Sequence, residues 1–153
     1  MSDLAERIDT IERGYEYLLA YAAQGRRDDS GSEVRATLTA MHAALDGLEK
    51  LLGEAIGRAG REAGGSRETG AGRETGGGRK TDEPREAGGA YSTPDVAAFL
   101  EAITEDARKA RGAIALVLSR PAISSLLVDN LNASIHLRAL LTDVFLVDQA
   151  LKT

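Results

Sequence analysis

The chain has 153 residues and a net charge of −5, and it contains neither Cys nor Trp. The absence of cysteine excludes disulfides, thiolate metal sites and cysteine nucleophiles. No segment carries the basic field that phosphate backbones attract, and no run approaches the ~18 apolar residues of a membrane span, so we expect a cytoplasmic protein that binds neither nucleic acid nor membrane.

The first part of the chain has the apolar periodicity of two amphipathic helices. Residues 3–24 carry apolar side chains at alternating spacings of four and three, and Gly25 can end this helix in the left-handed conformation. Residues 32–58 repeat the pattern, with glycines that become denser toward Gly57 and predict fraying from there. We therefore expect a helical hairpin within residues 1–60, made of helices at about 3–24 and 32–58.

A hexad repeat follows this hairpin, with an arginine at every sixth position of the sequence from Arg61 to Arg85. Residues 61–89 contain no Val, Ile, Leu, Met, Phe or Tyr, so a parallel β-helix would have nothing to bury in its rungs. Nine glycines and balanced charges cannot offset the entropy of ordering the chain. We expect residues 61–92 to form a long, disordered Gly/Arg/Glu-rich linker.

The last part of the chain predicts a second hairpin, within residues 93–153. Thr93, Pro94 and Asp95 are typical of a helix start, and the apolar stripe that follows predicts a helix over 94–118. Pro121 leaves two interpretations open, a tight turn or a kink in one long helix. A further helix is expected over 121–151. Together the elements predict an all-α fold, a four-helix bundle in which the two hairpins form one domain.

The main functional signal is that the segment 121–151 is apolar around most of its circumference. Such a helix is buried on more than one side, and an apolar surplus on a monomer predicts a protein partner or a homodimer. On the first helix, two tyrosines flank the core stripe and could meet the same partner. The interface candidates are Leu127, Val128, Leu131, Ile135, Phe145, Leu146, Tyr17 and Tyr21.

Polar residues on the last predicted helix offer an alternative. A narrow polar stripe contains Ser125, Asp129, Asn132, His136 and Asp143. His136 in this stripe is either a general acid, a pH-sensitive contact or a solvated side chain. Asn130 and Ser134 lie four residues apart on the apolar side, where buried polar groups could fix the register of the bundle or line a small cavity. The alternative function is therefore an enzyme, or a helical bundle that binds a small ligand or a metal, with a polar interior site near Asn130, Ser134 and His136.

Known chemical motifs are not found in the chain. The Glu-x-x-His units of di-iron bundles are absent, because Thr39 and Ala133 precede the two histidines at that spacing. Arg35 and His42 have a spacing loosely similar to the motif of HEPN ribonucleases, but nothing else matches and we do not assign the chain to that family. We assign no catalytic residue, cofactor or metal, and expect a non-enzymatic helical interaction protein: an adaptor, assembly factor or small regulatory subunit.

Overall fold

The computed structural model describes residues 3–71 and 93–152, and every regular element within these ranges is a helix. The helices are α1 (Asp3–Ala22), α2 (Val34–Leu45), α3 (Leu48–Ala71), α4 (Pro94–Leu118), α5 (Ser125–Ala133) and α6 (Ile135–Lys152). Within these residues, no helix combines the length and the apolar character needed to cross a bilayer.

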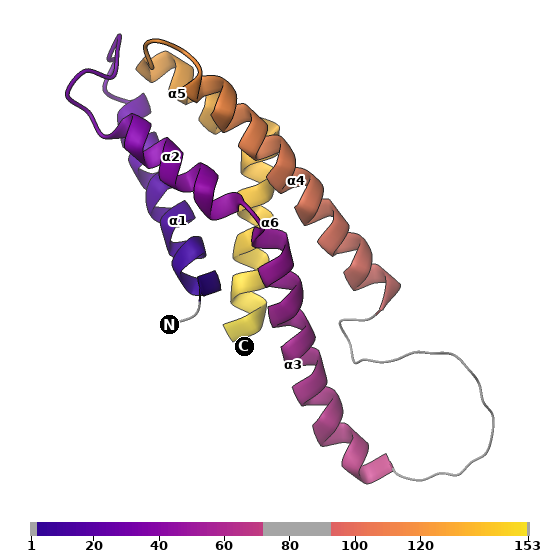
Figure 1. The fold of residues 1–153 in the computed structure, drawn as a ribbon. Helices are drawn as coiled ribbons and strands as arrows, with labels where there is room; N and C mark the ends of the chain where they lie inside the picture. The colour runs from indigo at the N-terminus through magenta and orange to yellow at the C-terminus, as the bar shows by residue number, and fades with distance from the viewer. Residues whose placement is uncertain (1–2, 72–92, 153) are drawn as a thin grey trace.

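The helices lie side by side along one long direction (Figure 1). α1 packs along α2, α4 packs along α6, and α2 also contacts α4, which joins the two parts of the chain. α5 lies near the upper end of the molecule in Figure 1 and packs against α1. α3 packs against both α4 and α6 before it runs on beyond them.

The expected helix over 32–58 is wrong in one respect, because it is divided into α2 and α3. Gly47 has φ +74°, a left-handed conformation that glycine adopts without strain, and it turns the chain between the two helices. Arg7 of α1 stabilises the end of α2 by donating to the carbonyl oxygens of Ala44 (3.3 Å) and Asp46. Arg7 therefore adds a contact from another helix to the turn that Gly47 makes.

The expected fraying near Gly57 and the expected linker start at residue 61 are also corrected, because α3 continues to Ala71. Each glycine in a helix costs about 1 kcal/mol relative to alanine. Extending a helix that is already nucleated nevertheless adds one hydrogen bond for each residue fixed, which favours propagation. Residues 72–92, the remainder of the expected linker, lie outside the described residues.

Of the two interpretations of Pro121, the turn is correct and the kinked helix is wrong. α4 ends at Leu118 and α5 begins at Ser125, so Pro121 lies between two helices. Ser124 caps α5 by accepting a hydrogen bond from the backbone N–H of Leu127 (3.0 Å). The expected single helix over 121–151 is wrong, since Ser134 adopts an extended conformation and divides it into α5 and α6. The Ser134 hydroxyl accepts from the N–H of Leu137 (3.3 Å) and so caps α6.

The core is made almost wholly of aliphatic side chains. It is lined by fully buried residues such as Ile11, Leu18, Leu38, Met41, Ile103, Ile114 and Leu137. α1 and α2 approach closely at Gly14, where an added Cβ would stand only 2.5 Å from Cγ and Sδ of Met41. Glycine at this position therefore serves packing between helices.

Candidate functional site

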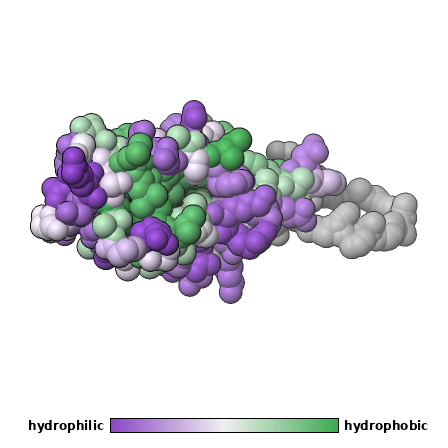
Figure 2. Space-filling view, turned by 90° about the horizontal axis from the view of Figure 1, so that it is seen from above, coloured by the Kyte–Doolittle hydropathy of each residue, from purple (hydrophilic) through white to green (hydrophobic). Residues whose placement is uncertain are grey.

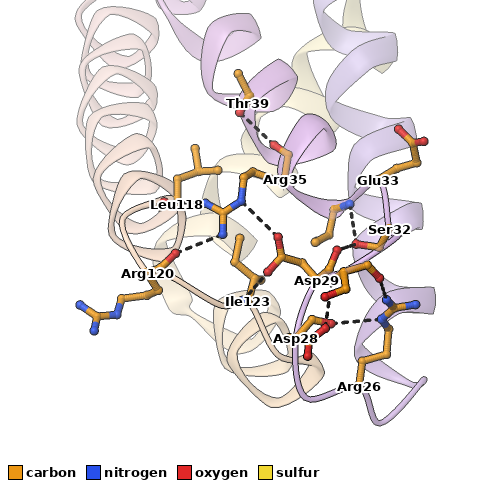
Figure 3. Close-up of polar contacts among 12 residues, drawn as sticks. Arg26, Asp28, Asp29, Ser32, Glu33, Arg35, Thr39, Leu118, Arg120 and Ile123 are labelled. Carbon is orange, nitrogen blue, oxygen red and sulfur yellow. Dashed lines mark hydrogen bonds and ion pairs between the residues drawn. The ribbon is translucent and has the colours of Figure 1, made fainter.

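Hydrogen bonds join the loop between α1 and α2 to the turn between α4 and α5 (Figure 3). Arg35 Nη1 donates to the carbonyl oxygen of Leu118 (2.9 Å) and Nη2 donates to that of Arg120 (3.1 Å), so one guanidinium satisfies the end of α4. Its Nε donates to Asp29 Oδ2 (3.2 Å). The N–H of Ile123 (2.9 Å) and then Arg35 hold the pKa of Asp29 below its usual range. Arg35 is thus engaged in structural contacts, which gives no support to a phosphate-binding role.

A second set of bonds ties the same two segments together in the interior. The buried Tyr21 hydroxyl donates to the carbonyl oxygen of Ile123 (2.6 Å), and Ser125 Oγ donates to the carbonyl oxygen of Tyr21 (2.6 Å). The backbone N–H of Arg26 donates to Ser125 Oγ (2.8 Å). We call the contacts of Tyr21, Arg26, Asp29, Arg35, Ile123 and Ser125 the loop lock. Tyr21, an expected interface residue, is therefore part of the interior.

The residues expected to form a polar interior site do not come together. Asn130 and His136 are exposed, and Ser134 is a half-buried helix cap. The buried polar residues are instead Ser125 and Asn132, whose Nδ2 donates to the carbonyl oxygen of Leu18 (3.2 Å). The sequence held a signal for this arrangement, because both lie at helical spacing with Val128 on the buried face of α5.

The expected interface residues divide between the core and the surface. Val128 and Leu131 are buried in the core, and Leu127 and Tyr17 are half-buried. The expectation of an interface is wrong for the buried residues, because α5 turns their face toward α1. The exposed candidates are Ile135 (72 %), Leu146 (58 %) and Phe145 (39 %), and all three belong to α6.

These exposed residues help to form an apolar face along the outside of α6. The opposite face of the helix holds its buried residues, Leu137, Leu140, Leu141, Val144 and Val147. On the 100° rotation per residue of an α-helix, six residues fall together on the outward side, and one of them is the polar Gln149. We call the other five the outer stripe: Ile135, Ala139, Thr142, Leu146 and Ala150. No charged residue interrupts this stripe.

A cation and a carboxyl flank the outer stripe on opposite sides. Arg138 is exposed and makes no ion pair with any residue that the structure describes. Asp143 is half-buried beside Asp106 of α4, and within the described ranges its buried Oδ2 has no hydrogen-bond donor. Burial, followed by hydrogen bonding to Asp106 and repulsion from its charge, raises the pKa of Asp143 to about 7. Near neutral pH a substantial fraction of Asp143 therefore carries a proton.

This raised pKa predicts a pH dependence of stability that Asp143→Asn removes. A carboxyl whose pKa is higher in the folded state stabilises the fold at low pH, and the contribution is lost as pH rises through about 7. At concentrations where the protein is monomeric, thermal melting of the wild type should therefore show a falling transition temperature between pH 5 and 8 relative to the variant. Parallel melting curves of the two proteins over this range would contradict the assignment.

The surface of the described residues also has shallow hollows, two of which lie between helices or at a turn. One lies between α1, α3 and α6, with Leu4, Ile8 and Leu151 in its lining and Arg58 and Asp148 among its polar residues. The other lies at the turn between α4 and α5, and its lining includes Arg120, Pro121, Ala122, Leu126 and Leu127. Figure 2 looks onto the end of the molecule that carries α5 and shows an apolar area there between polar margins. In the described part of the chain, no three His, Asp or Glu side chains gather to hold a metal ion.

The described residues thus offer apolar contact surface on the outside of α6. Its most continuous element is the outer stripe, which follows α6 and has a charged group on each flank. Comparisons with family models, curated proteins and solved structures find no match to this chain.

Proposed function

We propose that this chain is a non-enzymatic helical interaction protein that binds a protein helix through the outer stripe of α6. The observation that supports the proposal is the exposure of Ile135 and Leu146 on one uncharged helix face. Amphipathic helices bind grooves and other helices through apolar residues at spacings of three and four, which is the spacing of the outer stripe. The role is that of a cytoplasmic adaptor, assembly factor or small regulatory subunit.

The proposal retains the four-helix bundle expected from the sequence, but two of its four helices are each divided into a pair of helices joined at a bend. α2 and α3 form one such pair, and α5 and α6 form the other. In this arrangement the loop lock holds α5 against α1, while α6 packs along α4 and keeps its outward side open. A rigid helix that is already formed loses little conformational entropy when a partner binds, which favours association.

The size of the stripe matches a modest contact rather than a permanent complex. Full burial of an Ile or Leu side chain stabilises by about 1.5–3 kcal/mol relative to full exposure, and Ile135 and Leu146 are already partly covered. Association must also offset about 4–15 kcal/mol of lost translational and rotational freedom. Contacts on the flanks of the stripe are therefore needed in addition to its apolar centre.

Native mass spectrometry of the protein purified gently from its own source tests the proposal. We expect a homodimer or a complex with another protein in the wild type, and loss of that species in Leu146→Glu. The circular dichroism spectrum of the variant should match that of the wild type, because Leu146 is exposed and its loss leaves the core intact. Its melting temperature should fall only by the stabilisation that association adds to the wild type.

Two matched variants control for a general effect of a new surface charge. Leu116 of α4 is exposed by 65 % and Leu126 of α5 by 69 %, and neither belongs to the outer stripe. Leu116→Glu and Leu126→Glu should leave the complex intact. If Leu126→Glu dissociates the complex and Leu146→Glu does not, the binding surface lies at the apolar end shown in Figure 2 and the proposal for α6 is wrong.

A further inference from the structure

We infer that the partner helix on the outer stripe is α6 of a second copy of this chain, running parallel, with Arg138 of each copy facing Asp143 of the partner subunit. This inference rests on the proposed function, since it names the occupant of the same surface. It goes further by fixing the direction, the register and the ion pairs of the contact.

The direction and register follow from the spacing of the residues on α6. Ile135, Ala139, Thr142 and Leu146 are separated by four, three and four residues, which is the a/d pattern of a two-stranded coiled coil. Arg138 then occupies position g, and Asp143 occupies position e. In parallel pairs a residue at g faces the e residue that lies five positions later on the other helix. Arg138 and Asp143 have this separation, and the twofold symmetry of a dimer produces the pair twice.

The next g and e positions agree with the same register. Phe145 at g would face Ala150 of the partner subunit at e, so an apolar side chain meets an apolar one. At the centre of the stripe, the small side chains of Ala139 and Thr142 permit close approach of the two helices. The larger Ile135 and Leu146 then pack at either end. The exception is Gln149, a polar residue at the next d position, which would meet its own copy at the end of the contact.

Charge complementarity distinguishes this arrangement from an antiparallel one. In an antiparallel pair each flank meets the same flank of the other helix, because a twofold axis across the contact relates them. The flank with Arg138 also contains Phe145 and Lys152 but no acidic residue, so the guanidinium would find no carboxylate on α6 of the other copy. The parallel pair brings the two oppositely charged flanks together.

Each member of the proposed ion pair lacks a counterpart in the part of its own chain that the structure describes. Arg138 is exposed without an ion pair among the described residues, and the charged group that acts on Asp143 is another carboxyl, Asp106. The partner subunit's Arg138 would supply the positive charge that this carboxyl pair is missing. Ionised Asp143 is required for the pair, so association should be measured at pH 8, above the pKa of about 7.

Cysteine cross-linking tests the direction without disturbing the charges. The chain contains no cysteine, so single substitutions at the two ends of the stripe give an unambiguous result. In the parallel dimer Ile135→Cys and Leu146→Cys should each oxidise to a disulfide-linked homodimer, because each residue lies beside its own copy. Leu116→Cys on α4, which is similarly exposed, should stay monomeric under the same mild oxidation. Cross-linking only in a mixture of the Ile135→Cys and Leu146→Cys proteins would show an antiparallel pair and overturn the inference.

A charge swap tests the ion pair by sedimentation equilibrium at pH 8. Arg138→Asp and Asp143→Arg should each weaken dimerisation about tenfold or more, since each places like charges opposite one another. The double variant should return the dissociation constant to within about threefold of the wild type. Arg120→Asp, an exposed arginine outside α6, should have no effect. Because Asp143 is half-buried, the folding of the Asp143→Arg variant is checked by circular dichroism. If this variant does not fold, the cross-linking experiment alone decides whether the parallel dimer forms.

The outcomes separate this inference from the proposed function. A wild type that stays monomeric at all concentrations, or a dimer that Leu146→Glu dissociates but the single charge reversals leave unchanged, overturns the inference. In both cases the proposed function keeps its own test, which is loss of the native complex in Leu146→Glu. If that variant retains the complex, both are wrong.

Discussion

Replacing Arg35 with alanine should lower the free energy of unfolding by roughly 2–3 kcal/mol. The substitution removes the donors to the carbonyl oxygens of Leu118 and Arg120 and leaves Asp29 without its cation. A hydrogen bond to a charged group contributes about 1.5–3 kcal/mol, and the sum is reduced here because the Arg35 side chain is 39 % exposed and water replaces part of what is lost. Urea denaturation followed by circular dichroism measures the effect.

Two companion variants identify the cause of that loss. Arg120→Ala removes an exposed side chain and keeps the backbone carbonyl that Arg35 binds, so its stability should stay within about 0.5 kcal/mol of the wild type. Arg35→Lys keeps the charge but lacks the planar fork that bonds three acceptors at once, and should lose most of the stability that alanine loses. Equal stability of Arg35→Ala and Arg120→Ala would mean that the contacts of Arg35 do not stabilise the fold.

Gly14→Ala should destabilise the protein by about 1–2 kcal/mol, although alanine is the better helix former. Helix propensity alone favours alanine by about 1 kcal/mol. The new methyl group would stand 2.5 Å from Cγ and Sδ of Met41, and such overpacking costs about 1–3 kcal/mol or more when side chains must shift. These atoms lie within the Met41 side chain rather than at its tip, so they cannot move away cheaply.

Gly112 provides a control for the same substitution. It lies in the exposed part of α4, and an added Cβ there meets nothing within 4 Å, so Gly112→Ala should stabilise by up to about 1 kcal/mol. The two alanine substitutions should therefore have opposite signs in the same denaturation assay. Met41→Ala should make Gly14→Ala neutral or stabilising in a double-mutant cycle. Stabilisation by Gly14→Ala in the wild-type background would show that α1 and α2 separate at this point.

Local signals in the sequence were sufficient to predict where α4 begins. The start of α4 was predicted from Thr93 and Pro94, and the Thr93 hydroxyl accepts from the N–H of Val96 as a helix cap does (3.1 Å). The breaks at Gly47 and Ser134 were not predicted, because apolar periodicity continues across both of them. At Gly47 the decisive contact is Arg7, which reaches the end of α2 from another helix.

The errors in the candidate site have the same origin. A single helix over 121–151 places Val128, Ile135 and Leu146 on related faces, whereas the break at Ser134 turns α5 toward α1 and leaves α6 along α4. Val128 is therefore buried in the core, whereas Ile135 and Leu146 are exposed. A pattern of apolar residues indicates how much surface is buried, but the direction of burial depends on where each helix ends.

The loop lock also bears on how freely the hexad repeat can change in length. The bond from the backbone N–H of Arg26 to Ser125 Oγ joins positions 99 residues apart, so the chain between them forms one large closed loop. The contacts of α3 with α4 shorten this loop to the 22 residues between Ala71 and Pro94. Because the entropy of closing a loop grows only with the logarithm of its length, one more hexad there without contacts of its own would cost about 0.2 kcal/mol. The stability of the fold therefore depends closely on the contacts at the two ends of this loop and only weakly on the number of repeats between them.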